Sequence, residues 1–322
     1  MNFTDKNYLK WLFSLLFAIL TAALLYAAFF IRSYPLPITN RISFDAKLKF
    51  IEESIDREKV DTLIVGSSIG LNNVQGTILE QNTTQCRSVL NLSVFEASPI
   101  EVEQVLELRS LFPHIEQIIY SAQFPDFAEP SRFADYRPDL ITAYLDHHFT
   151  PREHALFLFH MCQNIFFCIK RQWNYLHKHS RKNQFGYLGF DKSGSVPLHI
   201  YGDDIIRSRW EQPHWTKQSP ANYQALARIA QQCQNEGIAF YFVIQPYRRA
   251  LLDRYPKIRT ALMQFDRNTT AIVTSEGGKV IHLNRTLPLD DSHFADRSHL
   301  NDKGSRASTL AIAAFLNKQT GP

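Results

Sequence analysis

A short apolar run that stops in three small residues constrains the fold of this chain more than any other stretch. Thr62–Val65 is apolar and partly β-branched, which is typical of a buried strand. Gly66 ends the run, and the hydroxyl residues Ser67 and Ser68 follow at once. Open α/β sheets place their sites at the carboxyl ends of the strands. The stretch therefore predicts an exposed serine at the start of a helix or helical turn.

A serine becomes a nucleophile only where a base reaches it, usually an imidazole oriented by a carboxylate. Asp296 and His299 lie near the far end of the chain, three residues apart, so on a helical turn they share a face. The competing interpretations are an ordinary strand-to-turn connection at 66–68, and a helix N-terminus that Asp296 caps beside a solvated His299. Because one block ends the first strand and the other precedes the last helix, the two together favour a Ser-His-Asp triad.

These two blocks carry a resemblance to a known family. Gly66-Ser67-Ser68 resembles the nucleophile block of the SGNH (GDSL-like) hydrolase superfamily, with Ser67 in place of the usual aspartate. Asp296-Arg-Ser-His299-Leu-Asn resembles the closing Asp-x-x-His block of that superfamily. A Gly-Ser-Ser block behind a membrane anchor is similar to the teichoic-acid D-alanylation proteins and to the alginate and peptidoglycan O-acetylation proteins. The resemblance covers 61–98 and 238–316, and not the middle of the chain.

The resemblance implies a three-layer α/β/α fold with a parallel, flavodoxin-like sheet. It also implies that Ser68 is the nucleophile, His299 the base and Asp296 the orienting acid. We expect no cofactor and no metal. The stretch Asp290-Asp291-Ser-His293 is a weaker metal candidate, and a solvated acidic loop is the favoured interpretation.

The donors for an oxyanion are where the chain departs from the family. SGNH enzymes usually use a glycine after the second strand and an asparagine after the third, but 91–98 contains no glycine and 121–124 no asparagine. The remaining candidates are the backbone N–H of Ser68, a backbone N–H within Ser93–Phe95, represented by Val94, and the side-chain amide of Gln123. The departure argues against fast general hydrolysis.

Two residues at strand ends are candidates for binding substrate. Arg248 follows a predicted strand and would grip an anionic group by bidentate contacts, although a solvated turn explains it equally well. Asn91, at the end of the second predicted strand, is the other candidate.

Trp11–Ile31 contains no charged residue and is long enough to cross a hydrocarbon core of about 30 Å at about 1.5 Å per residue. Tyr8 and Trp11 before it and Tyr34 after it suit anchoring at the two interfaces. A cleaved signal peptide is the competitor, but its apolar region usually covers only about 7–15 residues. The stretch therefore predicts an uncleaved, single-pass anchor.

The charges beside this anchor do not agree with the side that the resemblance implies. Two lysines precede the span, whereas four basic residues follow it within 32–49, and the positive-inside rule would keep the following domain inside. The resemblance implies a domain on the periplasmic or outer side of the inner (cytoplasmic) membrane. Our prediction follows the resemblance.

The domain organisation follows from these landmarks: a tail at 1–10, the anchor at 11–31, a proline-bearing linker at 32–43, and one domain at 44–322 with an insertion at about 127–218. Outside the insertion, apolar runs alternate with helical patterns, which predicts a parallel sheet between helices. The predicted strands are 62–65, 88–93, 116–122, 238–244 and 279–283, and the predicted helices are 44–58, 100–111, 219–236, 251–268 and 302–316. Within the insertion, a helix at 154–173 and a basic stretch at 170–182 predict a cover over the site.

Composition excludes some classes of protein. Apolar residues make up 45% and charged residues 20%, as in a globular protein, and the net charge is only +4. No basic run with interleaved aromatic residues occurs, so nucleic-acid binding is not expected. The four cysteines, at 86, 162, 168 and 233, lie in apolar surroundings that favour buried thiols.

Three functions fit this sequence, and the first is our prediction. It is a membrane-anchored serine acyltransferase that moves an acetyl or similar acyl group from a membrane-bound donor protein to a hydroxyl of a cell-envelope polysaccharide. The second is an esterase that uses the same triad with water as the acceptor. The third is a non-catalytic polysaccharide-binding scaffold on the same fold. The insertion favours transfer because it would exclude water.

Overall fold

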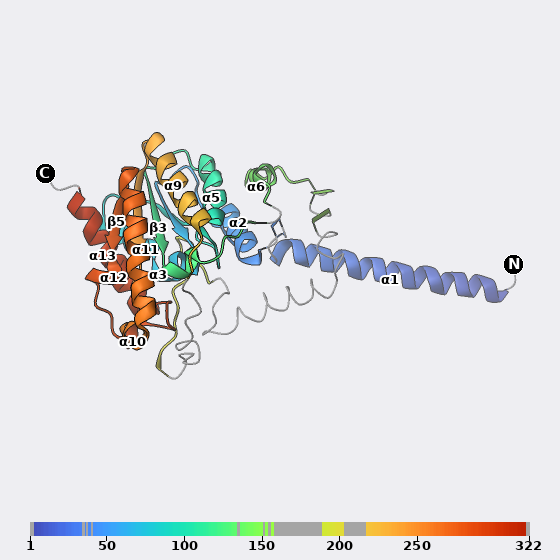
Figure 1. Cartoon of the computed structure of the whole chain (residues 1–322). Helices are drawn as coiled ribbons and strands as arrows, with labels where there is room; N and C mark the ends of the chain where they lie inside the picture. The colour runs from blue at the N-terminus through green and yellow to red at the C-terminus, as the bar shows by residue number, and fades with distance from the viewer. Residues whose placement is uncertain are drawn as a thin grey trace.

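The computed structural model describes residues 3–33, 36, 38–39, 41–133, 136–150, 152–153, 156–157, 189–202 and 217–319. Apart from 156–157, the predicted insertion helix at 154–173 and the basic stretch at 170–182 lie outside these ranges, as do Cys162 and Cys168. The described chain forms a long N-terminal helix and an α/β unit (Figure 1).

The N-terminal helix α1 (Phe3–Ser33) extends away from the α/β unit (Figure 1). Its stretch Asn7–Leu25 is long and apolar enough to cross a membrane, and no other described helix meets both conditions. The large apolar side chains of this stretch are exposed, for example those of Phe17 and Leu25. A row of exposed apolar side chains of this length is stable in lipid rather than in water, which supports the predicted anchor.

Five parallel strands form the sheet, in the order β2-β1-β3-β4-β5. The five predicted strands are confirmed, and the alternation of strands and helices gives the α/β class that the sequence predicted. The bounds of the strands are β1 (Thr62–Gly66), β2 (Val89–Asn91), β3 (Gln117–Ala122), β4 (Ala239–Ile244) and β5 (Lys279–His282). Because all strands run the same way, their carboxyl ends share one edge of the sheet.

Both faces of the sheet are buried, because successive side chains of a strand point to opposite sides. In β4, Phe242 belongs to one hydrophobic cluster and its neighbours Tyr241 and Val243 belong to another. The first cluster packs against α2 (Ile42–Ser54), α5 (Pro99–Leu106), α9 (Pro220–Asn235) and α11 (Pro256–Ser275). The second packs against α4 (Gly76–Asn82) and α13 (Asp302–Gln319).

Helix boundaries follow local backbone chemistry. Ser98 caps α5 with a capping box to Glu101, and Pro99 occupies its first turn. The helix predicted at 251–268 is two helices, α10 (Arg249–Arg254) and α11, because Pro256 has no amide hydrogen to continue the first. The other short elements are α3 (Ser68–Asn73), η1 (Glu107–Leu111), η2 (Phe124–Phe127), α6 (Pro138–Leu145), α12 (Leu283–Thr286) and η5 (Asp291–His293).

The described segment 189–202 of the insertion covers the outer edge of the sheet. The Asn91 N–H of edge strand β2 donates to the Ser193 carbonyl at 2.7 Å. Beneath it, the buried Lys47 ammonium donates to the Asn91 and Gly194 carbonyls and lies 4.2 Å from the centre of the Phe190 ring. This part of the insertion therefore satisfies an edge that would otherwise offer unpaired backbone groups.

Several described residues of the linker predicted at 32–43 pack against the α/β unit. The helix α1 continues to Ser33, and Leu36 and Ile38 are buried in the first hydrophobic cluster. The Thr39 N–H and hydroxyl both donate to Asp45 Oδ1, at 2.7 and 2.9 Å. The described residues of this segment therefore belong to the α/β unit, since their apolar side chains find a place in its core.

Candidate active site

The carboxyl end of β1 presents Ser68 at the edge of the sheet. Gly66 has φ +149°, and a Cβ there would lie 2.3 Å from the Ser121 carbonyl oxygen of β3, so the position requires glycine. Ser67 then caps α3, its hydroxyl accepting from the Ile69 N–H at 3.1 Å. Ser68 is consequently the first residue of α3, and its half-buried side chain faces a cleft.

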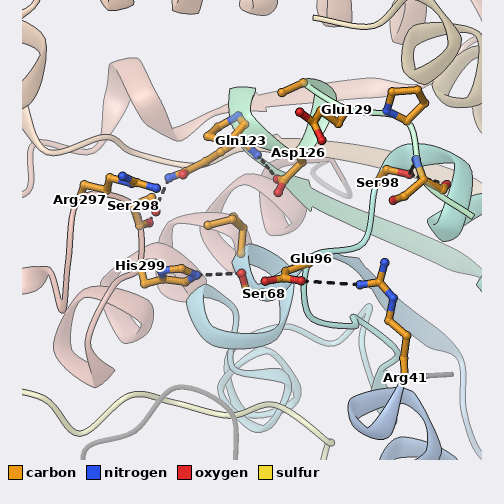
Figure 2. Close-up of a pocket in the computed structure, with 15 residues that line it drawn as sticks. Arg41, Ser68, Glu96, Ser98, Gln123, Asp126, Glu129, Arg297, Ser298 and His299 are labelled. Atoms are coloured by element: carbon orange, nitrogen blue, oxygen red, sulfur yellow. Dashed lines mark hydrogen bonds and ion pairs between the residues drawn. The ribbon is translucent and has the colours of Figure 1, made fainter. Parts of the chain in front are cut away.

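Ser68, His299 and Asp296 are brought together in a hydrogen-bonded row. The Ser68 hydroxyl oxygen lies 2.8 Å from His299 Nε2 (Figure 2), and His299 Nδ1 lies 2.9 Å from Asp296 Oδ2. The turn that carries the last two is not helical, contrary to the prediction. Asp296 Oδ1 instead accepts the backbone N–H groups of Ser298 and His299, at 2.9 and 2.7 Å, which closes an Asx-type turn.

The charge of Asp296 is fixed by its surroundings. Burial by itself raises the pKa of this carboxyl, but the nearby His299 and the hydrogen bonds from the His299 side chain and two backbone N–H groups outweigh it and hold the pKa at about 2. Asp296 is therefore ionised at all ordinary pH values. Its carboxylate accepts a hydrogen bond from His299 Nδ1, which carries the proton. That tautomer leaves Nε2 as the acceptor for the Ser68 hydroxyl.

Asn73 of α3 holds the histidine loop on both sides of His299. Its side-chain N–H donates to the Ser298 carbonyl at 3.3 Å, and its oxygen accepts the Leu300 N–H at 2.9 Å. Asn73 is fully buried and lies on α3, the helix that begins with Ser68. It therefore fixes the loop of His299 to the helix of Ser68.

The cleft beside this row has a volume of about 660 Å³. Its charged side chains are Arg41, Glu96, Asp126, Glu129 and Arg297 (Figure 2). Serine and proline residues complete much of the wall, and no described lining residue is aromatic. The cleft is therefore polar, with both signs of charge.

Of the three named candidates, Ser68, Val94 and Gln123, only Ser68 keeps an N–H without an acceptor among the described residues. The Val94 N–H donates to the Gly66 carbonyl at 3.0 Å, so this prediction was wrong. The Ser93 N–H donates to Asn91 Oδ1, and the Phe95 N–H has no acceptor in the described chain. Phe95 therefore replaces Val94 as the candidate within the predicted segment 93–95.

The Gln123 side chain is also engaged elsewhere. Its amide nitrogen donates to the Pro246 carbonyl at 2.7 Å and to the Ser298 carbonyl at 3.2 Å, and the residue is fully buried. Both N–H groups are used, so the predicted oxyanion role of this amide was wrong. Gln123 instead supports the loop that carries His299.

The two predicted substrate-binding residues do not line the cleft. Arg248 forms a bidentate ion pair with Asp291, at 2.8 and 2.7 Å. Asn91 is fully buried, and its amide donates to the Gly70 carbonyl and the Ser195 hydroxyl. Both predictions were wrong, because partners from distant segments take up the polar groups that substrate would need.

Asp126, Arg41 and Arg297 line the cleft instead and were missed by the sequence interpretation. Arg297 lies inside the Asp-x-x-His block, so its position next to Asp296 was a usable signal. Arg41 carries no such signal, because tertiary packing alone brings it to the cleft. Asp126 Oδ2 accepts a hydrogen bond from the backbone N–H of Gln123 at 2.7 Å. Burial raises the pKa of Asp126 to about 6, although hydrogen bonds with Ser67 and Gln123 and the nearby His299 lower it.

The alternative metal ligands are also occupied by protein partners. Asp290 Oδ1 lies 2.9 Å from His293 Nδ1, while Asp291 pairs with Arg248. Within the described residues, no three or more His, Cys, Asp or Glu side chains are grouped so that they would hold a metal ion. The two described cysteines, Cys86 and Cys233, are buried free thiols.

Comparison of the chain with protein-family models gives no match, and comparison with curated proteins gives no similar protein. The geometry of the site therefore carries the functional assignment.

Proposed function

We propose that this protein is a membrane-anchored serine acyltransferase of SGNH type. The observation that carries the proposal is the row Ser68–His299–Asp296, with 2.8 and 2.9 Å contacts at the carboxyl edge of a parallel sheet. The strand order is that of flavodoxin-like sheets, and helices pack against both faces, which supports the three-layer arrangement expected of that superfamily.

The proposed reaction has two balanced steps. His299 Nε2 takes the proton of Ser68 as its oxygen attacks the acyl carbonyl carbon of the donor, and the Ser68 N–H helps to stabilise the oxyanion. The intermediate collapses to an acyl-Ser68 ester, and the leaving group departs with the proton from Nε2. The acceptor hydroxyl then gives its proton to Nε2 as its oxygen attacks this ester, and the second intermediate breaks its bond to the Ser68 oxygen, which takes the proton back from Nε2. The products are the acylated acceptor and free Ser68.

The polar cleft supports a hydroxyl-rich acceptor. Carboxylates such as Asp126 and Glu129 accept hydrogen bonds from sugar hydroxyls, and the guanidinium of Arg297 donates to sugar oxygens. We therefore propose a cell-envelope polysaccharide as the acceptor and an acetyl or similar acyl group as the cargo. An esterase would use the same contacts with water as the acceptor.

The apolar stretch Asn7–Leu25 supports a single-pass anchor in the inner membrane. The proposal places the α/β unit on the periplasmic or outer side, where the polysaccharide would be found, and takes the acyl group from a membrane-bound donor protein. A cysteine-accessibility experiment tests the side: a cysteine introduced at exposed Lys257 of α11 should react with a membrane-impermeant maleimide in intact cells. Reaction only after lysis would place the domain inside.

A non-catalytic scaffold is the second candidate, favoured by one observation. The Val94 and Gln123 groups that would have received an oxyanion are bonded within the protein.

The decisive experiment uses the full-length protein in detergent with a fluorophosphonate serine probe. Wild type is compared with Ser68→Ala, His299→Ala and, as a control on a remote exposed serine, Ser275→Ala. Labelling of Ser68 that requires His299 and survives Ser275→Ala supports the proposal. A folded wild type that is not labelled would favour the scaffold. An aryl acetate with an oligosaccharide acceptor then separates acetylated acceptor from free acetate by mass spectrometry, and free acetate alone identifies an esterase.

A further inference from the structure

The segment after the membrane helix is part of the cleft wall. Leu36 is buried, yet it follows the last residue of α1, Ser33, by only three positions, which span at most about 11 Å of extended chain. Five residues further on, Arg41 precedes α2 and lines the cleft. The described residues that join the membrane helix to the sheet therefore reach the candidate active site directly.

Arg41 makes two directional contacts with the cleft wall. One guanidinium nitrogen donates to the Phe95 carbonyl at 3.1 Å, and another donates to Glu101 Oε1 at 2.6 Å. The Glu101 side chain is fully buried, and that of Arg41 is 22% exposed. The Glu96 carboxylate lies beside Arg41 (Figure 2), and its Oε2 is 4.0 Å from the guanidinium. A planar guanidinium is suited to hold a carbonyl and a carboxylate at once.

The carbonyl that Arg41 holds belongs to a strained turn. Glu96 has φ +58°, a left-handed conformation that few non-glycine residues adopt without outside support. The same turn contains the Phe95 N–H, which has no acceptor in the described chain. The turn also packs on the nucleophile helix, since a Cβ at Gly70 of α3 would meet the Ser93 hydroxyl at 2.4 Å.

The Glu101 carboxylate, which pairs with Arg41, holds a second part of the cleft wall in place. Glu101 Oε2 accepts the Ser98 N–H at 3.0 Å and the Ser131 hydroxyl at 2.6 Å, and both serines line the cleft. Without a cation, this buried carboxylate would lose its charge compensation. Arg41 thus supports two parts of the cleft wall. One is the turn formed by residues 93–97, which contains Phe95 and Glu96, and the other is the pair of serines that Glu101 binds.

We propose that Arg41 is a positioning residue of the candidate active site, supplied by the segment that follows the membrane helix. It holds the 93–97 turn against α3 in the geometry that receives the oxyanion of the Ser68 reaction. The inference rests on the proposed function. It also means that the connection to the membrane and the geometry of the reaction share one structural element.

The chain offers a matched control in Arg57. Its guanidinium also joins a carbonyl and a carboxylate, Leu145 O at 3.2 Å and Asp146 Oδ1 at 2.8 Å, and its side chain is 25% exposed. Arg57 does not line the cleft. Comparing Arg41→Gln and Arg41→Lys with Arg57→Gln and Arg57→Lys therefore separates positioning of the site from general stability.

The experiment measures the rate of fluorophosphonate labelling of Ser68 in the full-length protein, resolved into the binding constant KI and the maximal rate kinact. A group that acts only in the transition state changes the rate and not the binding. Arg41→Gln should lower kinact by roughly tenfold or more with KI within about twofold. Arg41→Lys, which keeps the pair with Glu101, should be intermediate, and the Arg57 variants should match wild type.

Two outcomes would overturn the inference. One is a kinact for folded Arg41→Gln that matches Arg57→Gln, and the other is a raised KI with kinact unchanged, which would make Arg41 a substrate contact. If Arg41→Gln fails to fold, the double variant Arg41→Gln/Glu101→Gln removes the unpaired charge, and the same comparison applies.

Hydrogen–deuterium exchange gives a readout that does not need activity. Arg41→Gln should raise exchange of the amides in the 93–97 turn, whereas Arg57→Gln should not, and equal protection would contradict the inference. A wild type that is not labelled at Ser68 would refute the proposed function, and with it the catalytic meaning of Arg41. Exchange would still decide whether Arg41 holds the turn.

Discussion

The imidazole of His299 lies 2.8 Å from the hydroxyl of Ser68, although the two residues are 231 positions apart. Ser68 follows β1, and His299 belongs to a loop that comes after β5 and returns across the carboxyl edge of the sheet. Asn73, on the helix of Ser68, binds the loop on both sides of the histidine. The distance is therefore set by a direct clamp between the two parts of the site.

Ser67 and Ser68 should respond differently to the same substitution. Ser68→Ala removes the proposed nucleophile, so labelling should be lost with stability nearly unchanged. Ser67→Ala removes the N-cap of α3, which typically costs about 1 kcal/mol, while the nucleophile remains. Intact mass spectrometry after labelling and thermal unfolding measure both effects. Labelling that survives in Ser68→Ala and disappears in Ser67→Ala would show that Ser67, and not Ser68, is the nucleophile.

Asp296→Asn should lower the labelling rate by roughly 10³- to 10⁴-fold, because an amide facing Nδ1 favours the wrong tautomer of His299. Asp290→Asn is the matched control, since Asp290 contacts His293 Nδ1 at 2.9 Å with the same three-residue spacing, away from the cleft. The measurement compares the rate constants for labelling of Ser68 in the two variants at pH 7. Equal rates would show that the Asp296–His299 contact is structural only.

Asn73→Ala should slow the reaction and also destabilise the fold. It leaves the buried Leu300 N–H without its acceptor, a cost of about 1–3 kcal/mol, and leaves the Ser298 carbonyl with only the Gln123 amide as a donor. The neighbouring Asn72 is equally buried but donates to the Val196 carbonyl, away from His299. Asn72→Ala should therefore lose stability without a comparable loss of labelling rate. Chemical denaturation and labelling kinetics on both variants test this, and equal rates would contradict the clamp.

Asp126 should make stability fall as pH rises from about 4 to about 6. Its pKa is about 6 in the folded protein against an ordinary value of 3.8, so over this range the native state binds more protons than the unfolded state. Asp126→Asn removes this dependence and should be more stable than wild type at pH 7–8 by roughly 1–2 kcal/mol, allowing for partial exposure. Below about pH 4 the two should converge.

Melting temperatures of wild type and Asp126→Asn across pH 3.5–8 provide the measurement for this prediction. Glu129→Gln, which neutralises an exposed carboxylate of the same cleft, controls for net charge. A pH profile of Asp126→Asn that parallels wild type would show that another group is responsible.

Gly66→Ala should destabilise the protein by about 3 kcal/mol or more, because alanine is strained at φ +149° and its Cβ would overlap the Ser121 carbonyl. Gly189→Ala, where a Cβ meets no atom within 4 Å, is the control and should have little effect. Urea unfolding midpoints compare the two. A Gly66→Ala protein as stable as the control would mean that β1 and β3 separate easily at the nucleophile turn.

The secondary structure could be predicted because its causes are local. Buried parallel strands read as short apolar runs, and Ser98-Pro99 marked a helix start through capping chemistry. The break between α10 and α11 was missed although Pro256 signals it. Within the predicted linker, Leu36 and Ile38 lie in the core, which their local sequence does not show.

The sequence by itself determined the strands, the apolar N-terminal helix and the residue types of the candidate triad, because backbone sterics, side-chain periodicity and short spacings act within a few residues. Tertiary structure alone decided which polar groups remain available. Val94 and Gln123 are bonded to carbonyls from distant segments, and Arg248 is paired with Asp291. Arg41 instead reaches the cleft from the segment between α1 and α2. Hydrogen-bond partners far apart in the chain are chosen by how the elements pack, and no local pattern records that choice.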